Sequence, residues 1–483
     1  MPRGPGSARG RRGDSTGVRM LRPLLLCMLL ATALPLGLAG CAQHPLTPTL
    51  TRVEPDSGYR LGARQRPGSS PELFVVLSFS GGGTRAAALD YGVLEVLRDT
   101  RIEVNGRSRR LLDEVDVISG VSGGSLPAAY FGVHGDGLFT DFESRMLKAN
   151  VQIGLSAPLA SPANWARLAS DDFGRTDLAA EYFDEHLFHG ATFADIDRRG
   201  GPLIIINATD TGLGEQFSFT QDTFDWICGD LAHYPVARAV AASSALPAVF
   251  SPLSLENHAG QCGYRLPPWA LRALEERRME SPDYRQAERI ASYQDANRRP
   301  VIHLLDGGVT DNLGVRAILD AFRFGEDPQA RLRHLGQVKR MLFIVVDAQN
   351  APYRDWLNSE SAPRFDAVVR SMSALTTRRY GIETLNRLRG ELRVWSERLR
   401  RNGHEVEYVE DGDQAIQKAQ EKVYGLLILD VRMPGHDGYE VCHFSKSTKQ
   451  NAKTPVLLIS AFSEESVKWR ESQADSFLAK PFE

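Results

Sequence analysis

The chain lacks a Cys-x-x-Cys pair, an excess of either charge and an apolar run of about 20 residues. Because its five cysteines are scattered, we expect no zinc site and no other metal in the main domain. Lys and Arg number 57 against 60 Asp and Glu, and the basic clusters are short. Binding to nucleic acid is therefore not expected.

Low-complexity tracts and repeats with a period of 20–50 residues are also absent, which excludes a solenoid. The composition, 42% hydrophobic and 24% charged, is typical of a globular protein with a large core. A length of 483 residues corresponds to roughly three domains of ~150 residues, or to a leader and two domains of which one is large.

The first 41 residues have the features of an export signal. Three arginines between positions 11 and 19 precede a short apolar run at 24–39, which ends in Leu-Ala-Gly-Cys41. These four residues resemble a bacterial lipobox, whose Cys becomes lipid-modified after cleavage. An uncleaved anchor is the alternative, although two prolines in or beside the run disfavour it. Met20 is a possible true start.

A lipid on Cys41 would make the protein a bacterial lipoprotein anchored to a membrane, facing the periplasm and expected in the outer membrane. Residues 42–70 are rich in Pro, Arg, Gly and Ser, which predicts a flexible tether. In an oxidising periplasm Cys228 and Cys262 could form a disulfide, and two buried thiols are the alternative.

An α/β fold with a mainly parallel sheet is predicted for residues 71–395. Near-continuous apolar runs, each followed by a helical or glycine-rich stretch, are typical of strands buried on both faces of such a sheet. The expected strands are Leu73–Ser80, Val115–Val121, Leu203–Ala208, Val301–Leu305 and Met341–Asp347. Residues 135–195 are expected to form a helical cap, and residues 265–300 a charged, helical insertion.

Three glycine-containing segments follow these strands. The first, Gly81-Gly82-Gly83-Thr84-Arg85, could direct main-chain N–H groups at an oxyanion or a phosphate, or could be a plain strand-to-helix turn. The second, Gly120-Val121-Ser122-Gly123-Gly124, has the Gly-x-Ser-x-Gly pattern that exposes a nucleophilic serine at a sharp bend. The third, Asp306-Gly307-Gly308, places a carboxylate at a strand end, where α/β proteins bind ligands.

The base that would activate Ser122 is expected to be Asp306. The histidines are poorly placed for this role: His303 should face the other side of its strand, His233 lies in a loop and His334 in a charged stretch. A carboxylate with an ordinary pKa of ~4 is a poor base for an alcohol, and burial would have to raise that pKa.

In this order and after these strands, GGGTR, GVSGG and DGG resemble the patatin-like phospholipases, as do Ala241–Pro252 and Asp306–Gly314. The resemblance covers roughly residues 71–395 and implies a three-layer α/β sandwich. It also implies a Ser122–Asp306 dyad and an oxyanion hole from the backbone of Gly81, Gly82 and Gly83, supported by Arg85. The implied activity is hydrolysis of acyl esters of phospholipids or other lipids, without a cofactor.

Residues 396–483 have a second, smaller doubly wound pattern, and GLLILDVRMPGHDG at 425–438 resembles a response-regulator receiver domain. The resemblance implies that Asp430 is the phosphorylated residue, with Ser460 and Lys480 binding the phosphoryl oxygens. The acidic pair that helps receivers hold Mg²⁺ is missing, and the chain stops where a last helix is expected. We therefore predict an incomplete, flavodoxin-like receiver domain, which would bind Mg²⁺ only if it is functional. We expect no histidine kinase as a partner. The alternative function is a phosphorelay protein whose receiver regulates the hydrolase.

Overall fold

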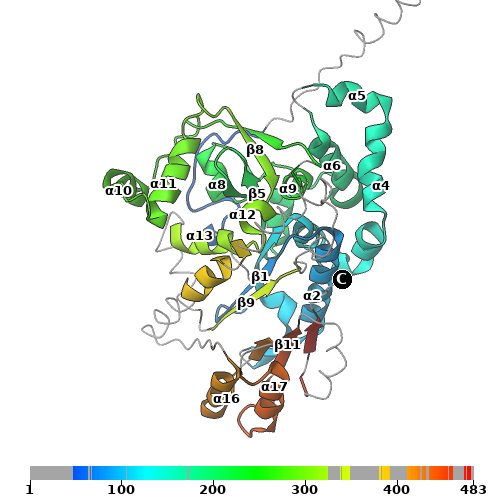
Figure 1. The fold of residues 1–483 in the computed structure, drawn as a ribbon, viewed down its shortest axis with the longest axis vertical. Helices are drawn as coiled ribbons and strands as arrows, with labels where there is room; N and C mark the ends of the chain where they lie inside the picture. Colours follow the sequence, from blue (N-terminus) through cyan, green and yellow to red (C-terminus); the bar gives the residue numbers. More distant parts are fainter. Residues whose placement is uncertain are drawn as a thin grey trace, which may run out of the picture.

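A computed structural model gives the fold of the chain (Figure 1). The structure describes residues 47–63, 66, 68–104, 106–170, 173–247, 249–324, 338, 340–348, 380–381, 383–391, 409, 411–424, 427–430, 435–454, 456–460, 473–474 and 476–479. The predicted leader with Cys41, the charged stretch with His334 and the segment at Lys480 lie outside these residues.

A seven-stranded sheet with the order β7-β8-β5-β4-β1-β9, and with β6 paired to β5, forms the centre of the larger domain. The four strands β9, β1, β4 and β5 are parallel, and β6 and β8 run antiparallel to β5. The strand bounds are β1 Leu73–Phe79, β4 Val115–Val121, β5 Leu203–Asp210, β6 Glu215–Ser218, β7 Leu253–Glu256, β8 Val301–Asp306 and β9 Arg340–Val346. A separate antiparallel hairpin joins β2 Arg101–Val104 to β3 Arg107–Arg110.

The five strands expected from apolar runs are all present, within two residues at each end. Every residue of β1 and β5 is buried, because helices cover both faces of the sheet at these strands. The short strands β2, β3, β6 and β7 were not predicted. They have four residues each and lack the long apolar run that marks a central strand.

The helices of the larger domain follow the strands, as expected for an α/β fold. Their bounds are α2 Gly83–Asp99, α3 Ser125–His134, α4 Val151–Ser156, α5 Pro162–Leu168, α6 Arg175–Phe183, α7 Phe193–Arg199, α8 Gln221–Trp226, α9 Val236–Ser243, α10 Pro268–Glu276, α11 Pro282–Tyr293, α12 Gly308–Asp311 and α13 Arg316–Phe324. Short 3-10 or π segments are η1 Leu61–Ala63, η2 Leu111–Glu114, η3 Ser122–Gly124, η4 Gly135–Gly137, η5 Leu138–Leu147, η6 Ala157–Ala160 and η7 Asp184–Phe188.

The two regions expected to be helical are helical. Residues 135–195 contain η4 to η7 with α4, α5 and α6, and Figure 1 shows α4, α5 and α6 together on one side of the domain. Residues 265–300 contain α10 and α11, which pack against each other on the opposite side in that view.

A second, three-stranded parallel sheet lies near the carboxyl end, with the order β10-β11-β12. Its elements are α16 Gly412–Glu421, β10 Leu427–Asp430, α17 Gly438–Ser447, β11 Val456–Ser460 and β12 Ser476–Ala479. It has its own small hydrophobic cluster, which includes Val441, Cys442 and Leu458. This confirms the predicted β-α-β order for the part that the structure describes.

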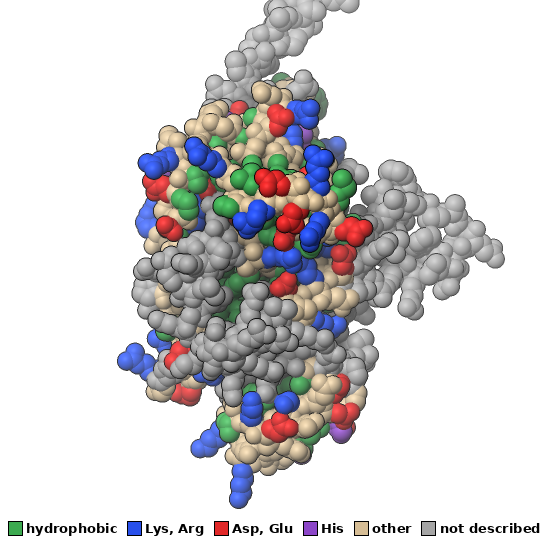
Figure 2. Space-filling view, turned by 90° about the vertical axis from the view of Figure 1, so that its left-hand side faces the viewer, with side chains coloured by type: hydrophobic (Ala, Val, Ile, Leu, Met, Phe, Trp, Pro, Cys, Tyr) green, Lys and Arg blue, Asp and Glu red, His purple; other side chains and the backbone are tan. Residues whose placement is uncertain are grey.

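Charges of both signs are interspersed on the face shown in Figure 2, in keeping with the near balance of acidic and basic residues. Within the described ranges, no helix has both the length and the apolar character needed to cross a bilayer.

Candidate active site

Ser122 lies in a sharp turn between β4 and α3. Its φ angle is +50°, a left-handed conformation that residues other than glycine rarely adopt. β4 ends at Val121, and η3 leads directly into α3. Such a strained strand–turn–helix junction presents a serine hydroxyl away from the backbone, as the Gly-x-Ser-x-Gly pattern predicted.

The glycines around Ser122 are required by close packing. A Cβ atom on Gly120 would lie 2.7 Å from Ser125 Cα, and one on Gly124 would lie 2.7 Å from the carbonyl oxygen of Ser80. A Cβ atom on Gly123 would overlap the backbone of Gly83. The turn at Ser122 is therefore packed directly against the first glycine-rich segment.

Asp306 is the hydrogen-bond partner of the serine. Ser122 Oγ donates to Asp306 Oδ2 at 2.8 Å, and the other carboxylate oxygen accepts the N–H of Gly308 at 2.8 Å. Asp306 ends β8, opposite Ala208 of β5, and its exposed fraction is 6%. Burial raises the pKa of Asp306 to about 6, although the hydrogen bonds from Gly308 and Ser122 oppose this rise. A carboxylate with this pKa is a better base near neutral pH than an ordinary one.

The described histidines do not reach the pair. His303 projects from the exposed side of β8, where its Nδ1 is 3.0 Å from Ser254 Oγ. His233 is exposed and pairs with Asp230 at 2.6 Å. Both positions agree with the sequence-based reasons for setting these histidines aside.

The first glycine-rich segment connects β1 to α2. Gly82 is the N-cap of α2 with a φ of 156°, and Gly83 begins the helix with a φ of 65°. The first N–H groups of a helix have no acceptor within the helix and can therefore bind an anion. Gly82 and Gly83 are exposed, so their N–H groups are suitable donors to an oxyanion.

The backbone N–H of Gly81 is not free, unlike the prediction that it contributes to the oxyanion hole. Its N–H already donates to the carbonyl oxygen of Asn312 at 3.0 Å, so this amide is not available to a substrate. The importance of Gly81 is steric, because a Cβ atom there would lie 3.1 Å from Ser122 Cβ and would overlap the side chain of Asn312. Three glycines in sequence suggested three equivalent donors, and only the folded structure shows which of them is already bonded.

Arg85 supports the segment from one side. Its Nη2 donates to the carbonyl oxygen of Ala348 at 2.7 Å, and the N–H of Ala348 donates to Ser80 Oγ at 2.7 Å. These bonds connect the end of β1 and the first turn of α2 to the residues after β9. Burial lowers the pKa of the Arg85 guanidinium.

Ser243 was missed by sequence reasoning. The N–H of Ser122 donates to Ser243 Oγ at 2.8 Å, and this hydroxyl donates to the carbonyl oxygen of Asn207 at 2.6 Å. Asn207 in turn donates through Nδ2 to the Gly120 carbonyl oxygen at 3.2 Å. The serine lies in the segment Ala241–Pro252, which resembled the family but had no assigned role. Its position in AASSALP was the available signal.

The structure contains the Cys228–Cys262 disulfide, with Cα atoms 5.4 Å apart. Of the two alternatives from the sequence, it therefore has the disulfide and not a pair of thiols.

In the smaller domain, Asp430 and Ser460 end the adjacent parallel strands β10 and β11, and Lys480 would follow β12. The side chains of these three residues lie outside the described part of the structure. Across the described residues, no group of three or more His, Cys, Asp and Glu side chains could hold a metal ion.

Residues 77–319 match the family described as patatin-like phospholipase, which is half of the chain. The chain belongs to this family. Membership implies that the larger domain is a lipid hydrolase.

Residues 388–483 match the response regulator receiver domain, so the chain also contains a receiver domain. Similar proteins include the transcriptional regulatory protein ResD of Bacillus subtilis, 37% identical over 20% of this chain and 38% of its own length. The gliding motility regulatory protein of Myxococcus xanthus is 38% identical over 16% of this chain and 10% of its own length. The chain thus spans well under half of these relatives.

Among solved structures, the receiver domain of the sensor histidine kinase PA1611 from Pseudomonas aeruginosa is 27% identical. The match covers 19% of this chain and 75% of that chain, with a TM-score of 0.16.

Proposed function

We propose that the larger domain hydrolyses acyl esters of lipids, with Ser122 as the nucleophile and Asp306 as its base. The observation that carries this proposal is the 2.8 Å hydrogen bond from Ser122 Oγ to a buried carboxylate, at the sharp turn between β4 and α3. The family match supports a lipid as the substrate.

In the proposed reaction, Asp306 accepts the proton of Ser122 Oγ while this oxygen attacks the carbonyl carbon of the ester. The oxyanion that forms is stabilised by the N–H groups of Gly82 and Gly83 and by the positive end of α2. The tetrahedral intermediate then collapses to an acyl-serine, and Asp306 gives its proton to the departing alcohol. A water molecule, deprotonated by Asp306, releases the fatty acid and restores the serine.

Ser243 positions the nucleophile in this scheme. Because its hydroxyl accepts the Ser122 N–H, it holds the backbone at the unusual φ angle of Ser122. It also occupies that N–H, so the oxyanion has to be bound by the amides of the glycine-rich segment.

We further propose that the chain works at a membrane, anchored through lipid on Cys41, with lipid or phospholipid as its substrate and no cofactor for the hydrolase. Tethering would hold the active site close to its substrate. Growth with radioactive palmitate, followed by isolation of the protein, tests the anchor: a Cys41→Ala variant should carry no label. Label retained by that variant would refute lipidation at this residue.

Chemical labelling of the full-length protein tests the mechanism. A fluorophosphonate probe should modify Ser122, and peptide mapping identifies the residue. Ser122→Ala should lose both labelling and ester hydrolysis. Asp306→Asn should lose hydrolysis while circular dichroism shows a folded protein. Near-normal turnover by Asp306→Asn would exclude the proposed base.

Regulation by the receiver domain is the competing hypothesis, and we propose that this receiver does not take up phosphate. The acidic pair of a receiver is missing from the sequence, and a Mg²⁺ site with one carboxylate is weak. Incubation with acetyl phosphate and Mg²⁺ should therefore leave the protein unlabelled. Label that is lost in Asp430→Ala would overturn this view.

A further inference from the structure

A cavity lies away from Ser122, between α8, α11 and α13. Its volume is about 110 Å³, and it begins at the amino-terminal end of β5, whereas Asp306 lies opposite Ala208 near the other end of that strand. Most of its lining is apolar and includes Leu203, Ile205, Trp226, Trp269, Ile290 and Phe324. The catalytic scheme gives this cavity no role.

Arg289 contributes a buried positive charge to the lining, with an exposed fraction of 8%. Its Nη1 donates to Gln286 Oε1 at 3.2 Å, its Nη2 donates to the carbonyl oxygen of Gln216, and its guanidinium lies 5.3 Å from the centre of the Trp226 ring. Its Nε is buried and has no acceptor. Among the described residues, no carboxylate lies within 4.0 Å of this guanidinium, so the charge has no counterion there.

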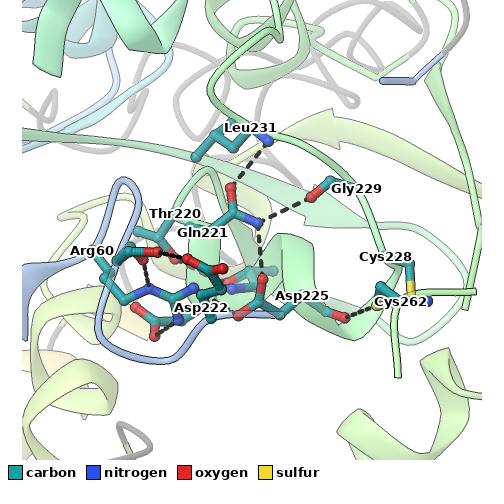
Figure 3. A network of polar contacts seen from close by, with 12 residues as sticks. Arg60, Thr220, Gln221, Asp222, Asp225, Cys228, Gly229, Leu231 and Cys262 are labelled. Atoms are coloured by element: carbon teal, nitrogen blue, oxygen red, sulfur yellow. Dashed lines mark hydrogen bonds and ion pairs between the residues drawn. A yellow bond between two sulfur atoms is a disulfide. The ribbon is translucent and has the colours of Figure 1, made fainter. Parts of the chain in front are cut away.

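The other arginine in the lining is fully paired. Arg60 forms salt bridges with Asp222 at 3.1 Å and Asp225 at 2.9 Å, as Figure 3 shows. Asp320, a further carboxylate of the lining, pairs with Arg387 at 2.7 Å. Asp56, the remaining carboxylate of the lining, is exposed, and Arg289 is the lining cation that has no carboxylate within 4.0 Å among the described residues.

A second buried donor lies in the same lining. The indole Nε1 of Trp269 is buried without an acceptor, and its ring packs against Phe324 with centroids 5.1 Å apart. Buried donors without partners are uncommon, because each loses its hydrogen bond to water and gains nothing in return. Both unpartnered donors therefore belong to residues that line the same cavity.

We infer that this cavity binds a fatty acid, with the carboxylate at Arg289 and the alkyl chain along the aromatic and aliphatic lining. A carboxylate supplies the counterion that the buried guanidinium lacks, and it can accept from Nε and a second N–H together. Because the lining is mostly apolar, a fatty acid fits this cavity better than a small hydrophilic anion does. A volume of about 110 Å³ is well above the roughly 10–15 Å³ that a single water needs, so the cavity has room for an alkyl chain of several carbons.

One wall of the cavity is held in place before a ligand arrives. Gln221, at the start of α8, donates to Asp225 at 2.8 Å and to the Gly229 carbonyl oxygen at 3.0 Å, and accepts the Leu231 N–H at 3.1 Å. Figure 3 shows this network beside the Cys228–Cys262 disulfide. A preformed wall reduces the entropy lost on binding.

Calorimetric titration of the full-length protein with sodium decanoate tests the inference. The active site is first blocked by a fluorophosphonate on Ser122, so that decanoate cannot be counted there. We expect one binding site, at least tenfold weaker binding of decanol, and at least a tenfold loss of affinity in Arg289→Met. Arg285→Met, on the exposed side of the same helix, is the matched control and should bind as the unmodified chain does.

A second variant covers the case in which Arg289→Met fails to fold. Ala321→Phe fills the cavity from α13 and should also prevent binding, while hydrolysis of a short ester by the unblocked protein stays unchanged. The inference is wrong if decanoate does not bind, binds Arg289→Met equally well, or binds only when Ser122 is unblocked. Because binding is read without turnover, failure of the hydrolase proposal would leave this result interpretable. If the probe does not react with Ser122, the decanoate affinities of the unblocked wild-type chain and of Arg289→Met are compared directly.

Discussion

Replacing Asp306 with Asn should abolish hydrolysis and at the same time stabilise the folded protein above pH 6. Asn keeps both hydrogen bonds, since its Oδ1 can accept the Gly308 N–H and its Nδ2 can donate to Ser122 Oγ. It removes a buried carboxylate that has no cation beside it among the residues that the structure describes. Enzymes commonly carry such destabilised groups at their active sites.

The magnitude follows from the pKa. Asp306 titrates at about 6 in the folded protein, against an ordinary value of 3.8. Between these values the unfolded chain has lost its proton and the folded chain still holds it, so the free energy of unfolding falls as the pH rises. The full difference corresponds to about 3 kcal/mol. This cost is about 0.6 kcal/mol at pH 4, where the unfolded side chain is already partly ionised, and it is nearly complete above pH 7.

Urea unfolding of the wild-type chain and of Asp306→Asn at pH 4, 5, 6 and 7.5 measures the effect. The variant should gain about 2.4 kcal/mol over the wild type between pH 4 and pH 7.5. In the same pH range, hydrolysis by the wild type should decline below about pH 6, because the base becomes protonated. A stability difference that does not change with pH, or activity that stays flat down to pH 4, would refute the reasoning.

Three further perturbations test the surroundings of the nucleophile and the disulfide. Ser243→Ala should lower kcat about tenfold with little change in KM, because the Ser122 N–H loses its acceptor. Ser243→Thr should restore part of the rate. Equal rates for Ser243→Ala and the wild type would exclude a positioning role. Gly123→Ala should lower both the melting temperature and fluorophosphonate labelling, since its Cβ would overlap the Gly83 backbone; unchanged labelling would count against the close packing. Replacing Cys228 and Cys262 with Ser should reduce the free energy of unfolding by about 4 kcal/mol, because the disulfide closes a loop with a 34-residue separation. Thermal or urea unfolding measures this loss. An unchanged free energy of unfolding would show that the bond is unimportant for stability.

The central strands could be predicted because each is a continuous apolar run, such as LFVVLSF in β1, that is buried on both faces. The pairing of Ser122 with Asp306 was also predictable, since both residues end strands of one sheet and the histidines were poorly placed. The antiparallel direction of β8 was not, because a strand's direction depends on how the chain returns to the sheet. The engagement of the Gly81 amide by Asn312 depends on a contact 231 residues along the chain, which no local pattern encodes.

The two members of the proposed dyad are 184 residues apart in the chain, and they meet only where β4 and β8 are both in the sheet. During synthesis, a nascent polypeptide that has not yet emerged past Asp306 would hold a serine without its proton acceptor. Under the proposed mechanism such a chain is inert toward membranes, so lipid cleavage begins only after β8 has joined the sheet. Truncated products that end before β8 should therefore be harmless to the cell that makes them.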